Sequence, residues 1–83
     1  MLFQSDVIFL DHSTKKGESK DFHSVSVLDM GGVYRKFGFV GNVSDFDFLN
    51  QNDSCVGIFK IRFGKEKEAY IVKGIDCISI KKK

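Results

Sequence analysis

The chain has 83 residues, of which 42% are hydrophobic and 29% charged, and its formal net charge is +2. This size and balance predict one globular domain, residues 1–83, with a small core, and exclude a disordered chain. The longest apolar run, Val7–Leu10, is far shorter than the roughly 20 residues of a membrane-spanning helix, and no secretory signal opens the chain, so we expect a cytoplasmic protein without membrane contact.

The first half of the chain predicts three strands. Nine phenylalanines and a single alanine favour strands over helices. Strand-like runs occupy Asp6–Asp11 and Phe22–Met30, and the segment Ser13–Ser19 between them is rich in turn formers and lysine. Gly31-Gly32 indicates a two-residue hairpin turn into a third strand, Val33–Val40.

The second half predicts a short helix and two longer strands. Ser44–Gln51 suits a helix with Ser44 as its N-cap and with Phe46 and Leu49 on one apolar face. Ser54–Phe63 and Ala69–Ile80 are the strands, joined by the polar turn Gly64–Glu68, and Lys81–Lys83 is expected to fray.

The turn Gly64–Glu68 implies a register between the last two strands. Pairing Gly64 with Ala69 brings Phe63 opposite Tyr70 and Lys60 opposite Lys73, a like-charge pair that is unfavourable without an anion. The same register places Cys55 and Cys77 on opposite faces, so we expect two free thiols, as is usual in a cytoplasm.

The order of these elements predicts the fold class. Three strands, a short helix and two strands match the OB-fold, an all-β five-stranded barrel with one helix between strands three and four. An SH3-like barrel is the alternative, but it has no helix at that point. OB-folds bind oligonucleotides or oligosaccharides on strands two and three and on two neighbouring loops.

Side-chain alternation on the second and third strands predicts an aromatic outer face. Val25 and Val27 mark the core side of the second strand, which turns Phe22 outward together with two serines. Phe37 and Phe39 mark the core side of the third strand, which leaves Tyr34 and Lys36 outside. In the competing interpretation, Phe22 tucks under the neighbouring loop and Tyr34 covers an end of the barrel.

Exposed rings beside lysines suit an unpaired nucleic acid, because bases stack on the rings and the ammonium groups contact phosphates. The uneven charge supports this, since eight basic residues stand against three acidic ones from Ser54 onward. The candidate nucleic-acid-binding residues are Lys15, Lys16, Lys20, Phe22, Tyr34, Lys36, Lys60, Arg62, Lys65, Lys67, Tyr70 and Lys73.

Two segments resemble a known family. Lys16–Phe22, followed by Val25, Val27, Asp29 and Gly31-Gly32, resembles the basic loop, aromatic residue and strand of small phage single-stranded-DNA-binding proteins. Val56–Gly64, continuing to Ile80, is similar in layout to the last hairpin of filamentous-phage helix-destabilising proteins. The resemblance implies an OB-fold homodimer that coats single strands during phage DNA replication in a bacterial host, with Lys20 and Phe22 as the basic and aromatic pair. Ser19 and Asp21 depart from the glycine and proline that are usual there.

The sequence offers little for catalysis. His12 and His23 are the only histidines, no catalytic or phosphate-loop motif occurs, and Asp45, Asp47 and Asp53 are too irregularly spaced for a calcium loop. We therefore expect no enzyme activity, cofactor or metal. The first hypothesis is a sequence-tolerant single-stranded-DNA-binding protein, with RNA as a further ligand to consider. The alternative is a protein-interaction module, such as a phage-encoded inhibitor of a host enzyme.

Overall fold

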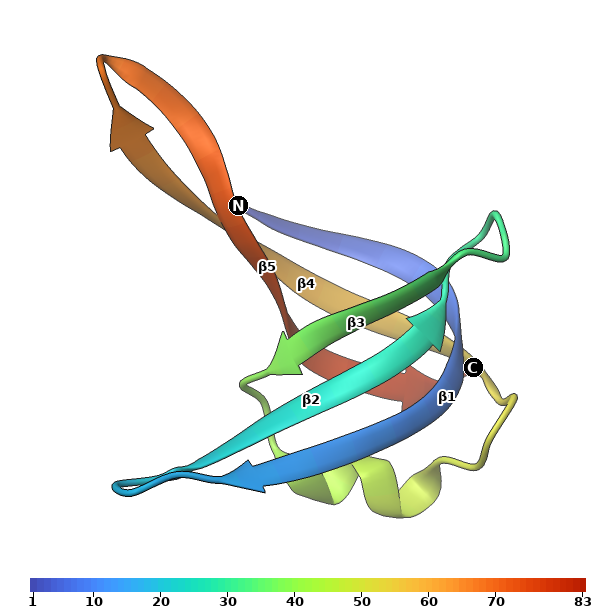
Figure 1. Ribbon diagram of the computed structural model, residues 1–83. Helices are drawn as coiled ribbons and strands as arrows, with labels where there is room; N and C mark the ends of the chain where they lie inside the picture. The colour runs from blue at the N-terminus through green and yellow to red at the C-terminus, as the bar shows by residue number, and fades with distance from the viewer.

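The computed structural model describes all 83 residues and shows a closed five-stranded barrel (Figure 1). The elements are β1 (Leu2–Lys16), β2 (Asp21–Leu28), β3 (Tyr34–Phe39), the 3-10 helix η1 (Val43–Phe48), β4 (Ser54–Glu66) and β5 (Ala69–Lys82). The strand order is β1-β2-β3-β5-β4, and β1 closes the barrel by pairing with both β2 and β4. The predicted all-β, OB-like barrel with one short helix between the third and fourth strands is confirmed.

The core confirms the alternation expected for β2 and β3. Val25 and Val27 are fully buried, and Phe39 is 3% exposed, whereas Ser24 and Ser26, which alternate with the valines, are only partly buried. The remaining buried hydrophobic residues come from β1, from η1 and the residue that follows it, and from β4 and β5: Val7, Phe9, Phe46, Leu49, Cys55, Phe59, Cys77 and Ile80. The helix η1 has only six residues, so the structure contains no helix that could span a membrane.

The helix η1 closes one end of the barrel with the ring of Phe46. That ring lies 4.5 Å from the ring of Phe39 and 4.4 Å from the ring of His12, centroid to centroid. The predicted N-cap was wrong, because Asn42 caps the helix instead. Its Oδ1 accepts hydrogen bonds from the backbone N of Ser44 at 3.0 Å and from the Ser44 hydroxyl at 2.8 Å.

The connection between β2 and β3 differs from the predicted two-residue turn. The backbone N of Asp29 donates to the carbonyl of Val33, which leaves a three-residue loop ending at Gly32, whose φ is +77°. The Asp29 carboxylate organises this loop by accepting hydrogen bonds from the backbone N of Val33 and Gly31, both at 2.9 Å. The bond from Val33, together with Arg35, lowers the pKa of Asp29.

The register between β4 and β5 also differs from the prediction. The turn is only two residues long, Lys67-Glu68, with left-handed φ values of 49° and 70°, so Glu66 pairs with Ala69. Two register shifts leave Lys73 and Ile78 unpaired on β5.

The two-residue turn and these shifts correct three expectations, because the turn sets the register of the arm and each extra residue swaps the faces beyond it. Lys60 lies opposite Asp76 rather than Lys73, so the like-charge pair does not form, and Phe63 lies opposite Val72 rather than Tyr70. Cys55 and Cys77 do not lie on opposite faces, since both are fully buried in the core, and both are free, as expected.

Beyond the barrel, β4 and β5 continue as a projecting two-stranded arm (Figure 1). We define the arm as residues 62–73, because the pairing of β1 with β4 ends at Leu2 and Lys60. The other end of β5 does not fray as predicted. The backbone N of Lys83 donates to the carbonyl of Ser54 at 3.0 Å, and its ammonium lies 3.0 Å from Asp6 Oδ2.

Burial raises the pKa of the Cys77 thiol from 9.0 to about 11. The folded protein therefore holds this proton more tightly than the unfolded chain does. The stabilising contribution of the protonated Cys77 thiol to the free energy of unfolding is present below about pH 9 and is lost as the pH rises towards about 11. Urea titrations should show a shallower loss of stability over this range for Cys77→Ala than for the wild type. The same slope in both proteins would contradict the burial of an intact thiol.

Candidate nucleic-acid interface

The predicted outer face exists and carries two exposed rings. We define the β2–β3 face by its outward residues, which are Phe22, Ser24, Ser26, Tyr34, Lys36 and Gly38. Phe22 is 55% exposed and Tyr34 58% exposed, so neither ring is sealed inside the barrel. Tyr34 pairs with Leu28, six positions along β2 from Phe22, so the two residues are roughly 20 Å apart at their Cα atoms. They stand at opposite ends of the face.

Phe22 sits among basic groups of the β1–β2 hairpin. The Lys20 ammonium lies 5.5 Å from the centroid of the Phe22 ring, within the range of a cation–π contact. Lys15, on β1, pairs directly with Phe22 on β2. One part of the ring packs on Gly17, where a Cβ would come within 2.8 Å of a ring carbon. The hairpin therefore covers one side of the ring and leaves more than half of it open.

The middle of the face is polar. The Tyr34 hydroxyl is hydrogen-bonded to the Ser26 hydroxyl at 3.0 Å, which ties this ring to the neighbouring strand. Lys36 lies opposite Ser26, and Gly38 opposite Ser24. A ring at each end with hydroxyls and an ammonium between them leaves room for several nucleotides along the strands.

Not every predicted residue joins this face. Lys16 lies opposite Asp21, one position along from the Lys15–Phe22 pair, so alternation turns it to the other side of the hairpin. Lys65, Lys67, Tyr70 and Lys73 belong to the arm, which projects away from the barrel (Figure 1). The structure does not bring these five residues together with Phe22 and Tyr34.

Lys60, together with Arg62 at the base of the arm, extends the face across β5 to β4 through a residue that the sequence analysis missed. Asp76 on β5 pairs with Gly38 on one side and with Lys60 on the other. Its Oδ2 lies 2.7 Å from Nε of Arg62. The correct register between β4 and β5 would have revealed the role of Asp76, because this residue lies directly opposite Lys60.

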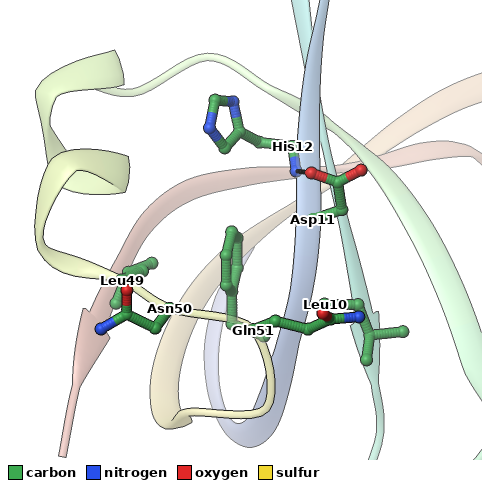
Figure 2. Close-up of a pocket in the computed structure, with 7 residues that line it drawn as sticks. Leu10, Asp11, His12, Leu49, Asn50 and Gln51 are labelled. Atoms are coloured by element: carbon green, nitrogen blue, oxygen red, sulfur yellow. Dashed lines mark hydrogen bonds between the residues drawn. The ribbon is translucent and has the colours of Figure 1, made fainter.

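A hollow of about 400 Å³ lies on another part of the barrel, between β1 and the segment that follows η1 (Figure 2). His12 and Asp11 come from β1, and Leu49, Asn50 and Gln51 from that segment. The His12 ring lies parallel to the Phe46 ring, and its backbone N donates to Asp11 Oδ1 at 2.8 Å. No lysine or arginine lines this hollow, so it lacks the groups that would hold phosphates.

The geometry of the β2–β3 face is the main guide to function. No group of three or more histidine, cysteine or acidic side chains is arranged to hold a metal ion. Comparison with known proteins found no matching family model, no matching curated protein and no matching solved structure. The β2–β3 face can stack the planar rings of a ligand on Phe22 and Tyr34, and its lysines can neutralise the ligand's negative charges at the same time.

Proposed function

We propose that the chain is a non-catalytic, sequence-tolerant single-stranded-DNA-binding protein that destabilises duplexes during phage DNA replication in the cytoplasm of a bacterial host. The observation that carries this proposal is the pair of exposed rings, Phe22 and Tyr34, on a face bordered by Lys15, Lys20 and Lys36. The hydroxyls of Ser26 and Tyr34 lie on the same face and are hydrogen-bonded to each other.

The two kinds of group divide the work of binding. Unpaired bases stack on Phe22 and Tyr34, and this is sequence-tolerant because every base has a π-face. The lysines contact the backbone phosphates and release the cations condensed on them. In a duplex the bases already stack on one another, so the rings favour the unpaired strand and shift the equilibrium towards it.

The affinity should depend on salt. If Lys15, Lys20, Lys36 and Lys60 neutralise about four phosphates, log K should fall against log salt with a slope of roughly −3, at about 0.7 per contact. A gel shift with a labelled 30-mer, single-stranded against duplex, at several salt concentrations measures both the slope and the preference. A salt-independent affinity, or equal binding of the duplex, would count against the proposal. Oligo-U in the same assay compares RNA with DNA.

We also infer that the protein is a homodimer joined through the arm. Phe63, Tyr70 and Val72 are 48%, 77% and 58% exposed, and the register places all three on one side of the arm. The whole chain exposes 5927 Å², whereas a monomeric protein of 9.4 kDa is expected to expose about 5,000 Å². The excess of roughly 900 Å² is close to the ~800 Å² that each partner buries in a standard interface.

The charges at the tip of the arm favour a second copy as the partner. Lys65, Glu66, Lys67 and Glu68 alternate in sign. In a two-fold dimer the same patch meets itself, so each lysine can lie against a glutamate of the other arm.

Replacing Phe63 and Val72 with serine should weaken dimerisation at least tenfold, because two buried apolar anchors are lost from each copy. Sedimentation equilibrium measures the association. Phe48→Ser is the matched control, since Phe48 is 77% exposed but lies on η1, away from the arm. A wild-type chain that stays monomeric would refute the dimer. The exposed arm would then favour the alternative function, a protein-interaction module such as an inhibitor of a host enzyme.

A further inference from the structure

A hollow of about 350 Å³ opens on the β2–β3 face, at the lower end of the range for small-ligand sites. Phe22 and Lys20 line one side and Asp76 another, and Gly38 on β3 and Val40, just beyond its end, also line the hollow. The hollow exists because Gly38 has no side chain. A Cβ at this position would stand 3.1 Å from Oδ1 of Asp76, inside the space.

Asp76 presents one carboxylate oxygen to this hollow. Its Oδ2 is held by Arg62 at 2.7 Å, so the carboxylate is fixed in orientation, and Oδ1 is the oxygen nearest to Gly38. The side chain is only 17% exposed. A charged acceptor that is fixed and shielded from water favours a donor that arrives with a ligand.

The charges of the hollow identify the part of a nucleotide that fits. Asp21 and Asp76 both line it, and two carboxylates repel a phosphate. A base is neutral and planar, and it can stack on Phe22 while its phosphate remains at the rim near Lys20. The exocyclic amino group of cytosine donates to carboxylates, whereas uracil and thymine present a carbonyl oxygen at the same position, which Oδ1 repels.

We propose that this hollow is a nucleobase subsite that prefers a base carrying an amino group, with Asp76 Oδ1 as the acceptor and Phe22 as the stacking wall. The inference rests on the proposed function and refines it. Binding along the whole strand is sequence-tolerant, but one position in each site distinguishes an amino group from a carbonyl group.

The test compares oligo-dC with oligo-dU, which differ in the amino or carbonyl group at C4 and in the proton on the adjacent ring nitrogen. Measurements at about pH 8 keep cytosine neutral. The wild-type protein should bind oligo-dC at least about fivefold more tightly than oligo-dU. Asp76→Asn should bring this ratio close to one, because an amide both donates and accepts. Asp47→Asn removes the same charge from η1 and should leave the ratio unchanged.

Gly38→Ala provides a second variant that leaves Asp76 and its contact with Arg62 in place. Its methyl group would occupy the hollow beside Oδ1, so it should also lower the dC/dU ratio. Equal binding of both oligonucleotides by the wild type, or a ratio that Asp76→Asn leaves intact, overturns the base subsite alone. Failure to bind either oligonucleotide overturns the proposed function, and the subsite with it.

Discussion

Replacing Phe22 and Tyr34 together with alanine is expected to weaken binding of oligo-dT by about 30-fold or more while the chain stays folded. Stacking contributes roughly 1–3 kcal/mol for each base, so two rings account for at least about 2 kcal/mol of the binding free energy. Fluorescence anisotropy with a labelled oligo-dT measures the loss. Each single variant should lose about fivefold or more, because the rings are far enough apart to hold different bases.

Thermal melting separates this effect from unfolding. Both rings are more than half exposed, so the melting temperature of the double variant should stay within about two degrees of the wild type. Phe48→Ala is the matched control, because Phe48 is more exposed than either ring but lies on η1. It should leave the affinity unchanged. An equal loss in this control, or a large drop in melting temperature of the double variant, would show that the face has been misassigned.

Gly41→Ala is expected to lower the free energy of unfolding by about 3 kcal/mol, at the upper end of the cost of overpacking. Gly41 lies just beyond β3, where this strand meets β5, and the backbone N of Val40 donates to the carbonyl of Cys77 at 3.0 Å. A Cβ at Gly41 would overlap the carbonyl oxygen of Ile78. Because that atom belongs to the backbone, one of the two strands must move.

The barrel seam explains why this single methyl group matters. Only two register pairs, Gly38 with Asp76 and Phe39 with Cys77, join β3 to β5, so a displaced strand opens the barrel there. Gly31→Ala is the matched control, since its Cβ would meet only Asp29 Oδ1, at 3.4 Å, and should cost no more than about 1 kcal/mol. Urea titration measures both variants. Equal stability of the two would contradict a tight seam at Gly41.

The parts of the fold that the sequence predicted are those where the two faces of a strand differ clearly. On β2, buried valines alternate with serines, and this contrast correctly turned Phe22 outward. On β3, Phe39 is buried and Tyr34 is exposed, as alternation required. The short helix was placed correctly between β3 and β4, because the apolar residues Phe46, in η1, and Leu49, directly after it, are both buried.

The parts that the sequence did not predict depend on turn geometry and bulges. Lys67 and Glu68 both adopt left-handed conformations that usually call for asparagine or glycine, so the tight turn had no sequence signal. The extra residues Lys73 and Ile78 then changed the faces of β5. For that reason the position of Asp76 beside Lys60 and Gly38 could not be foreseen, although it shapes the candidate site.

The most direct test of the central claim, that unpaired DNA lies on the β2–β3 face, is a titration of the isotope-labelled protein with oligo-dT followed by amide NMR. The account predicts that the largest shifts occur at Phe22–Ser26 and Tyr34–Gly38, and that η1 (Val43–Phe48) is little affected. Shifts confined to η1 or to the arm, or a spectrum unchanged at saturating oligo-dT, would contradict it.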